Sequence, residues 1–345
     1  MSILKLAPAC KDYLWGGTKL ITDYGKRYDG ARLAETWELS GHPDGPSVLA
    51  SGPDAGKTLA DYLAAHPGAL GEHGRKFAEL PVLIKLIDAA KDLSIQVHPD
   101  DAYARAHEGQ NGKTEMWYVL SAAPDAFLYC GFSRDISRDE LARRIADNTL
   151  PEVLRRVNVK AGDTVFIPAG TIHASGHNQV ILEIGSLTVG SYTYKLYDYQ
   201  RIDPQTGLPR PIHLAAGRKV IHPERTAGWV TENLVNHGGV KRQGEGYVER
   251  TVGEHELLYF ALHTETFDRV ITDDTRDRFH VLALTEGEQV RIESQADPAR
   301  HFVANYLDVI VVPADFGPYR IVNLGQGPVT VHKTCLKDSF ETCAR

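Results

Sequence analysis

Short apolar runs separated by turn residues dominate the chain and predict a strand-rich protein. Apolar, aromatic and β-branched residues recur between clusters of Gly, Pro, Asn and Asp, a pattern typical of strands joined by turns. Many short strands with this turn spacing indicate a jelly roll or barrel. The expected strands are Trp117–Leu120, Ala126–Cys130, Thr164–Ile167, Gln179–Ile184, Ser191–Leu196, Leu257–Leu262, Phe279–Leu284, Gln289–Ile292, Val309–Val312, Tyr319–Val322 and Thr330–His332.

Helical signals are few and lie between the predicted strands. One helix is predicted over Thr58–Ala65, where the threonine is a good N-cap and the following apolar residues share one face. Ser137 followed by Glu140 is a capping-box pattern, which opens a second helix over Asp139–Asp147. We expect Pro151–Arg156 to add another helical segment. The predicted fold class is therefore mainly β with helical insertions.

Two domains are expected, because Gly and charged residues concentrate around Thr231–Arg250. We place the division between a catalytic domain at 1–236 and a smaller C-terminal β-domain at 237–345. A chain of 345 residues is long enough for two ordinary domains.

Composition and charge exclude some classes of binding partner. Charged residues make up 24% and hydrophobic residues 42%, which is normal for a globular protein. The formal net charge of −7 gives no basic surplus, so we expect neither a nucleic-acid nor an anionic membrane partner. No apolar stretch is long enough for a membrane span, and the first residues do not resemble a signal peptide. The scattered cysteines, Cys10, Cys130, Cys335 and Cys343, favour a reducing cytoplasm over a disulfide framework.

Polar residues alternate with apolar ones from Leu93 to His98. Ser94, Gln96 and His98 are spaced by two residues, so on a strand they share one face, while Ile95 and its neighbour Val97 point the other way. Such a face requires a polar or metal-containing interior, or else it is exposed to solvent. This segment alone leaves both interpretations open.

A second polar face follows after a loop. Lys113, Glu115 and Trp117 share one strand face, and Thr114 and Met116 lie on the other. Lys113 and Glu115 could belong to a functional site, but a salt bridge at the rim of a sheet would explain this pair of charges equally well.

The third segment has a more specific pattern. A Gly-Asp turn at Gly162 leads into an apolar strand, Pro168 ends it, Gly170 provides a tight corner, and His173 begins the next strand, with Asn178 beyond it. This G-x5-P-x-G-x2-H spacing resembles the second characteristic motif of the cupins, small metal-binding jelly rolls. The resemblance implies that His173 is a metal ligand aimed inward by the proline-glycine corner.

The cupin resemblance changes the interpretation of the first two segments. Gln96-x-His98 stands in for the His-x-His pair of the first cupin motif, and Glu115 follows as its downstream carboxylate. Two imidazoles, one carboxylate and one amide suit a borderline divalent ion, with zinc the leading candidate. We expect one zinc ion per chain, bound by His98, Glu115, His173 and Gln96.

The motifs together resemble the type I mannose-6-phosphate isomerases in their shorter bacterial form. The resemblance covers roughly residues 6–220 and rests on LSIQVHPDD, GKTEMWYVL, IPAGTIHA and YKLYDYQR, with further matches at Trp15–Gly17, Glu35–Glu38 and Leu83–Ala89. It implies a zinc-dependent aldose–ketose isomerase that interconverts mannose 6-phosphate and fructose 6-phosphate. Its phosphate-side positions fall on Ser94 and Lys85, with Arg201 a weaker addition, and a further active-site lysine falls on Lys113.

One position departs from the family pattern. Where the family places an arginine in Thr-Tyr-Arg-x-Tyr-Asp, this chain has Lys195. An ammonium group is a compact point charge and does not reproduce the bidentate guanidinium. Isomerisation moves a proton between C1 and C2, for which Lys195, Lys113 and Glu183 are candidates as acid, base or oxyanion partner. Two alternatives stay open: a related isomerase for another sugar or phosphosugar, and a non-catalytic sugar-binding cupin.

The C-terminal part contains an echo of the proline-glycine corner. Val309–Pro318 resembles the segment that precedes His173, but Pro318 stands where the histidine would fall. We therefore expect a degenerate, cupin-like C-terminal domain without a metal.

Overall fold

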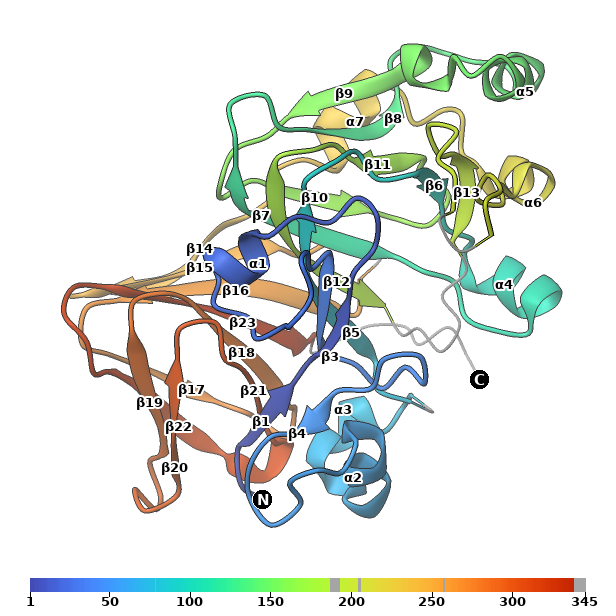
Figure 1. The fold of residues 1–345 in the computed structure, drawn as a ribbon. Helices are drawn as coiled ribbons and strands as arrows, with labels where there is room; N and C mark the ends of the chain where they lie inside the picture. Colours follow the sequence, from blue (N-terminus) through green and yellow to red (C-terminus); the bar gives the residue numbers. More distant parts are fainter. Residues whose placement is uncertain (78, 187–192, 204–205, 257, 338–345) are drawn as a thin grey trace. The chain divides into compact units, whose positions relative to one another are not determined.

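The computed structural model describes residues 1–77, 79–186, 193–203, 206–256 and 258–337 (Figure 1). Strands joined into antiparallel ladders are its main regular structure, with short helices between them. This architecture confirms the predicted fold class, mainly β with helical insertions.

The chain forms two compact units that alternate along the sequence. The first unit comprises Met1–Ala9, Trp37–Leu83 and the residues from His237 onward, and the second comprises Cys10–Thr36 and Ile84–Asn236. The boundary predicted at 236/237 stays a prediction, since the structure groups the residues after it with two earlier segments of the chain.

Two sheets form most of the second unit. The larger has the strand order β10-β7-β12-β5-β3-β2, and the smaller has the order β13-β6-β11-β8-β9. The strands are β2 (Ala9–Lys11), β3 (Glu35–Leu39), β5 (Val82–Ala89), β6 (Ile95–Val97), β7 (Glu115–Ala122), β8 (Phe127–Phe132), β9 (Leu154–Asn158), β10 (Thr164–Ile167), β11 (His173–Ser175), β12 (Gln179–Ser186) and β13 (Tyr194–Tyr197). The chain crosses between the units within β3 and β5.

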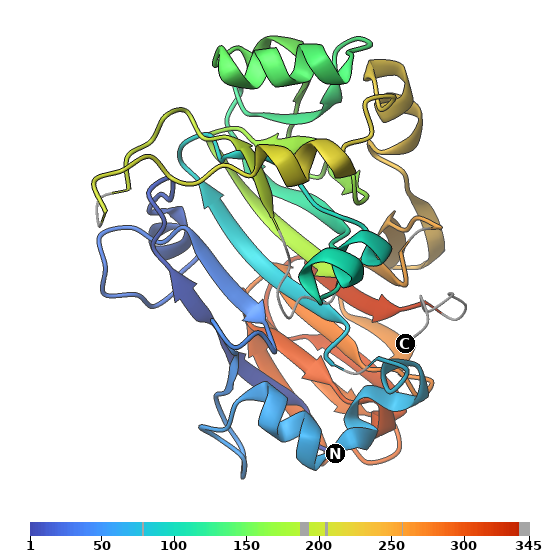
Figure 2. The same cartoon turned by 90° about the vertical axis from the view of Figure 1, so that its right-hand side faces the viewer.

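Helices of the second unit lie against its smaller sheet. They are α4 (Asp101–Glu108), α5 (Arg138–Ala146), α6 (Leu214–Val220) and α7 (Ala227–Asn233). The short helix α1 (Lys19–Thr22) is instead tied to the larger sheet by a 2.7 Å hydrogen bond from the Lys19 amide to Asp88 of β5. Figures 1 and 2 show α4, α5 and α6 on one side of the strands. Leu141 and Ile145 of α5 share an apolar core with Ile95 and Val97 of β6. The helices thus cover one face of this sheet and leave its other face for the polar residues.

The helix predicted at Asp139–Asp147 is confirmed as α5. Its N-cap Ser137 accepts a hydrogen bond of 3.1 Å from the Glu140 amide. The predicted helix at Pro151–Arg156 is wrong, because only Leu150–Val153 form a 3-10 turn and the chain then enters β9. β9 pairs with β8, and these ladder bonds outweigh the local helical signal.

The first unit contains an eight-stranded sheet with the order β14-β15-β16-β23-β18-β21-β1-β4, and a four-stranded sheet with the order β17-β22-β19-β20. The strands are β1 (Leu4–Ala7), β4 (Val48–Leu49), β14 (Gly239–Gly244), β15 (Tyr247–Gly253), β16 (Phe260–Phe267), β17 (Val270–Asp274), β18 (His280–Glu286), β19 (Gln289–Ser294), β20 (His301–Asn305), β21 (Val309–Val312), β22 (Pro318–Asn323) and β23 (Val329–Leu336). The helices α2 (Leu59–Ala65) and α3 (Gly71–Gly74) belong to the same unit. Thr58 caps α2 as predicted, accepting from the Asp61 amide.

The predicted C-terminal strands are confirmed with small shifts of their ends. Residue 257, at the start of one predicted strand, and residues 191–192, at the start of another, lie outside the described residues. Val309–Val312 is a strand with the predicted bounds, and a 3-10 turn at Ala314–Phe316 leads to Gly317, whose φ is +74°. The corner therefore has a glycine in the left-handed region, where a side chain would be strained.

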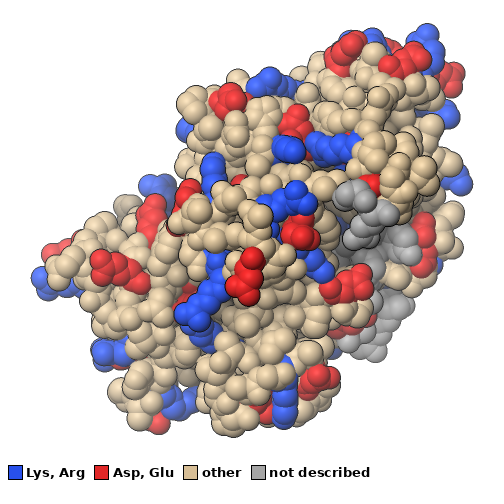
Figure 3. Space-filling view, in the orientation of Figure 1, with Lys and Arg blue, Asp and Glu red and all other residues tan. Residues whose placement is uncertain are grey.

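Charges of both signs are interspersed over the face of the molecule shown in Figure 3. Among the described residues, no helix has the length and apolar character that crossing a membrane requires.

A buried ammonium lies inside the first unit. Lys333 on β23 is 3% exposed, and its Nζ lies 3.0 Å from Glu249 Oε1 and 2.7 Å from Glu265 Oε1, with Asp273 as a third partner. Lys241 and Arg242 also pair with Glu249, but Lys333 is the one described cation that contacts all three carboxylates. Removing a buried partner of several carboxylates is strongly destabilising.

Replacing Lys333 with Met should therefore lower the free energy of unfolding by about 3–5 kcal/mol in urea denaturation. The matched control is Lys57→Met, which removes an exposed lysine from its 2.7 Å ion pair with Asp54 in the same unit. Because water solvates that pair, the control should leave the unfolding midpoint almost unchanged. Equal midpoints for the two variants would contradict a stabilising role of Lys333.

Candidate active site

Strand pairing in the smaller sheet brings three polar side chains into one row. Gln96 on β6 is directly opposite His173 on β11 and directly opposite Lys195 on β13. Side chains at directly opposite positions of an antiparallel pair lie on the same face of the sheet. Lys195, Gln96 and His173 are therefore neighbours across three strands that are far apart in the sequence.

The alternation predicted around His98 is confirmed. Ile95 and Val97 are fully buried in the apolar core under the helices, together with Ile172 and Ala174. Gln96 and His173 alternate with these residues and so project from the opposite face. The polar face is not an exposed surface, because His98 is 1% exposed and His173 has no exposed surface.

The proline-glycine corner sets the position of His173. Gly170 has a φ of +81°, and its amide donates a 2.8 Å hydrogen bond to the His98 carbonyl. This bond joins the end of β6 to the turn that begins β11. The two histidines are consequently brought close together, with ring centroids 4.9 Å apart.

Glu115 at the start of β7 lies between these two imidazoles. Its Oε1 is 2.9 Å from His173 Nε2 and 3.3 Å from His98 Nε2. All three side chains are buried, and their ligand atoms lie within 4.8 Å of one another. They are the one group of this kind among the described residues, and they comprise three of the four predicted ligands.

The hydrogen bonds of His173 indicate that a cation belongs in this group. His173 Nδ1 lies 2.8 Å from the Thr171 carbonyl, which can only accept, so Nδ1 carries the proton. In the neutral ring, Nε2 then presents a lone pair to the Glu115 carboxylate at 2.9 Å. Two acceptors at this distance repel each other unless a proton or metal ion lies between them.

The spacing of the donors fits zinc. Two ligands each 2.0–2.1 Å from zinc at a tetrahedral angle lie about 3.3 Å apart. The separations of 2.9 Å and 3.3 Å around Glu115 Oε1 are close to this value. A backbone carbonyl on the far nitrogen of a metal-binding histidine is the usual arrangement that orients the ring. The site therefore has the ligand types, the burial and the outer hydrogen bond that a zinc ion requires.

Gln96 borders the group, but its role as fourth ligand stays a prediction. Its amide nitrogen lies 3.3 Å from His173 Nε2. The nitrogen and oxygen of an amide side chain are assigned from the hydrogen-bond network, and exchanging them would present the oxygen to the same position.

Burial keeps His98 neutral. Loss of solvent is the largest effect and lowers the pKa of His98 to about 4, against the opposing influence of Glu115. The imidazole lone pair is therefore available to a metal at neutral pH. Burial disfavours the charged form of Glu115, but Lys113 and the histidines outweigh it and hold the pKa of Glu115 well below its usual value.

Charged residues beside the metal group form a second cluster. Lys113 Nζ lies 2.6 Å from Glu115 Oε2 and 3.0 Å from Glu183 Oε1. Burial opposes the charge of Lys113, yet these two carboxylates raise its pKa above the ordinary lysine value. Lys85 on β5 lies 3.4 Å from Glu183 and 3.6 Å from Glu35. The structure thus brings together Lys85, Lys113 and Glu183. These three residues were predicted to belong to one active site.

The remaining predicted residues differ in their surroundings. Ser94 is 7% exposed and comes immediately before β6. Burial, followed by the nearby charge of Arg210, lowers the pKa of Lys195 below the ordinary lysine value. Arg201 lies 3.5 Å from Asp198 and donates to the Asp92 carbonyl, contacts that fit a structural role.

Sequence reasoning gave no role to two residues that contact the site. The indole of Trp117 packs edge-on against the His173 ring at 5.5 Å, and Glu35 approaches Lys85. Trp117 and Glu115 share one face of a strand, and this alternation is the sequence signal that places Trp117 near the site. Nothing in the spacing of Glu35 indicates its partner, because β3 and β5 are distant in sequence.

Two antiparallel sheets around a buried His–Glu–His group define a mainly β protein with a candidate metal site. A model of the type I phosphomannose isomerase catalytic domain matches residues 3–132. Mannose-6-phosphate isomerase ManA of Bacillus subtilis is 39% identical over 224 residues, which are 63% of this chain and 69% of that protein.

Solved structures agree over nearly the whole chain. The crystal structure of mannose 6-phosphate isomerase from Bacillus subtilis has a TM-score of 0.84 at 28% identity, covering 97% of this chain and 99% of that one. A zinc-bound mannose 6-phosphate isomerase has a TM-score of 0.73 at 18% identity, covering 96% and 99%, and supports the fold alone. The chain belongs to the type I phosphomannose isomerase family, and the predicted family is confirmed.

Replacing His173 with Ala should abolish stoichiometric zinc binding, because it removes a metal-ligating nitrogen that no neighbouring described side chain replaces. Metal content per chain, measured by mass spectrometry after dialysis against excess zinc, tests this. The matched control is His177→Ala, four residues on, whose ring pairs with Asp92 at 2.6 Å and lies outside the ligand group. Retained zinc in the His173 variant would refute the ligand assignment.

Proposed function

We propose that this chain interconverts mannose 6-phosphate and fructose 6-phosphate with one zinc ion held by His98, Glu115, His173 and Gln96. The observation that carries the proposal is the buried His–Glu–His group with the Lys113–Glu183 ion pair beside it. Family membership supports the substrate, since the relatives above bear the name of this reaction. When bound, zinc supplies Lewis-acid stabilisation of negative charge on the sugar oxygens at C1 and C2.

Lys113 acts as a fixed positive donor. Its ammonium is held by Glu115 and Glu183, and its raised pKa keeps it protonated at neutral pH. A group in this state cannot accept the substrate proton. It orients Glu115 and provides a charged hydrogen-bond donor where oxyanion charge develops.

Glu183 and Lys195 are the residues that we propose move the proton between C1 and C2. Glu183 is 4% exposed and faces the site from β12, directly opposite Trp117 on β7. Lys195 approaches from the other sheet through its pairing with Gln96. A substrate between the two sheets would have one of these groups on each side, an arrangement that suits a proton donor and a proton acceptor.

Lys85 and Ser94 are our proposed phosphate residues. The Lys85 ammonium lies beside two carboxylates, Glu35 and Glu183, so a phosphate would have to compete with them for its charge. Support for Arg201 is smaller, because its guanidinium is already engaged by Asp198 and the Asp92 carbonyl.

A related isomerase for another phosphosugar is the second candidate, favoured by Lys195 in place of the family arginine. A coupled assay of the zinc-loaded chain with a panel of hexose and pentose phosphates separates the two. Turnover of mannose 6-phosphate above all others is expected. No turnover of mannose 6-phosphate or fructose 6-phosphate would refute the proposed function.

We also propose a cytoplasmic location and a sugar phosphate as the small-molecule partner. Cys130 and Cys335 are free thiols in the part of the chain that the structure describes. Unpaired cysteines are usual in a reducing compartment.

Replacing Lys195 with Met should reduce kcat by about 10²–10⁴-fold, the range for loss of an acid–base group. Lys195→Arg restores the family's usual residue and should retain far more activity than Lys195→Met. Steady-state kinetics with zinc content checked in parallel measures both. Equal kcat for the Met variant and the unaltered chain would remove Lys195 from the proton transfer.

A further inference from the structure

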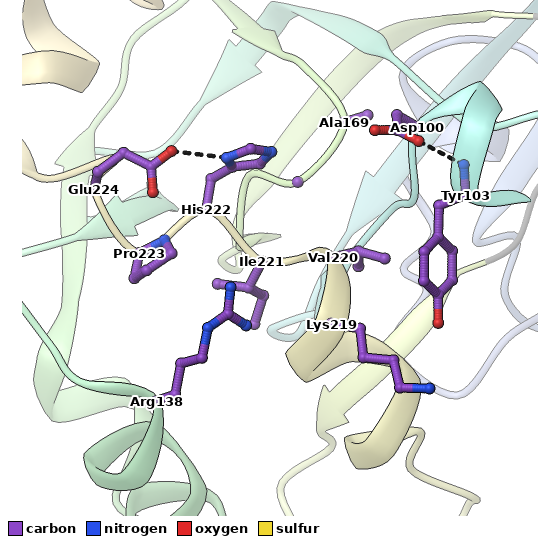
Figure 4. Close-up of a pocket in the computed structure, with 11 residues that line it drawn as sticks. Asp100, Tyr103, Arg138, Ala169, Lys219, Val220, Ile221, His222, Pro223 and Glu224 are labelled. Carbon is purple, nitrogen blue, oxygen red and sulfur yellow. Dashed lines mark hydrogen bonds and ion pairs between the residues drawn. The ribbon is translucent and has the colours of Figure 1, made fainter.

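A pocket of about 280 Å³ opens between three helices of the second unit. Figure 4 shows the side chains that enter it, with Tyr103 from α4, Arg138 from α5 and Lys219 from α6. We propose that this pocket is a second ligand site, separate from the metal group, that binds a phosphate monoester of a small carbohydrate or free phosphate.

The pocket lies on the opposite face of the smaller sheet from the metal ligands. Its floor is formed by Val220 and Ile221, which belong to the same apolar core as Ile95 and Val97. Those two strand residues alternate with Gln96, which points toward the metal group. A ligand in the pocket is therefore separated from the active site by the sheet itself.

Positive charge in the pocket is left without a partner. Among the residues that the structure describes, Arg138 and Lys219 form no ion pair, and the Tyr103 hydroxyl forms no hydrogen bond. One N–H group of Arg138 donates a hydrogen bond to the Arg218 carbonyl. Its other N–H groups are available to a ligand. Two exposed cations and a tyrosine from three helices thus line one cavity.

The acidic residues of the lining are already engaged. Asp100 caps α4 and accepts a 2.7 Å hydrogen bond from the Tyr103 amide. Glu224 lies 2.7 Å from His222 Nδ1, an interaction drawn in Figure 4. Neither carboxylate contacts Arg138 or Lys219, so the charge that remains for a ligand is positive.

The pocket wall is formed before any ligand binds. The His222 amide donates a 2.9 Å hydrogen bond to the Gly170 carbonyl, and its ring lies so close that a Cβ on Gly170 would be 2.0 Å from His222 Cδ2. This hydrogen bond fixes the backbone of the wall, whereas the His222 side chain is 45% exposed. A preformed site loses less free energy in ordering on binding.

These features match a small dianion with a polar body. A guanidinium binds two phosphate oxygens at once, and an ammonium adds a second charge. The volume of 280 Å³ is near the lower end of ligand pockets, about 300 Å³, which suits a monosaccharide phosphate better than a nucleotide. The Tyr103 hydroxyl can bond a sugar hydroxyl, and the Val220 floor can pack against carbon.

Calorimetric titration of the zinc-loaded full chain with inorganic phosphate tests the site. The experiment compares Lys85→Met with the same chain also carrying Arg138→Gln and Lys219→Gln. Lys85→Met weakens phosphate binding in the proposed active site, so the remaining binding reports on the pocket. We expect at least about a tenfold loss of affinity from the two pocket substitutions, the effect of removing charged hydrogen bonds.

The matched control is Arg143→Gln, an exposed arginine on α5 outside the pocket lining, which should leave the affinity unchanged. A loss of fructose 6-phosphate affinity caused by the two pocket substitutions would assign the site to sugar phosphates, and a loss of inorganic phosphate affinity alone would assign it to free phosphate. Affinity that is the same with and without the two pocket substitutions, or no binding in Lys85→Met, would overturn the proposal. Binding of inorganic phosphate involves no turnover, so failure of the isomerase assignment would not affect that result.

Discussion

The contact between Glu115 and two buried imidazoles is the constraint on which the rest of the site depends. A buried carboxylate oxygen 2.9 Å from His173 Nε2 is unfavourable unless a proton or a cation lies between the two atoms. A divalent cation turns the same contact into a stable coordination site. Lys113 stabilises the outer oxygen of Glu115, and the Thr171 carbonyl holds the His173 tautomer that aims Nε2 inward. With a cation bound between these ligands, Lys113 and the Thr171 carbonyl therefore both serve to hold the ligands in position.

The two sheets of the second unit provide this arrangement by their strand alternation. One face of β6 packs against the helix-covered core, and its other face carries Gln96 toward the site. β7 and β12 contribute Glu115 and Glu183 from the opposite sheet. The acidic and basic side chains thus meet in a buried interior, where electrostatic interactions are stronger than in water. This is the environment in which fixed charges can stabilise an oxyanion.

The sequence predicted the metal group well because its signals are local. His173 follows a proline-glycine corner whose geometry is set by a few adjacent residues, and His98 directly follows a short alternating strand. The position of Lys195 beside Gln96 depends on pairing between β13 and β6, which no local pattern reports. The same limit explains the helix wrongly predicted at Pro151–Arg156, where pairing with β8 decided the structure. The proposed phosphate pocket is lined by residues of three helices, and for the same reason no local pattern in the sequence predicts it.

Zinc titration of chelator-treated enzyme tests the central claim most directly. The chain is stripped of metal, its fold is checked by circular dichroism, and isomerase activity is followed as zinc is added. The account predicts no activity without metal and a linear recovery that ends at one zinc per chain, because His98, Glu115 and His173 form one site. Full activity in the stripped, folded enzyme, or recovery that continues well beyond one equivalent, would contradict it.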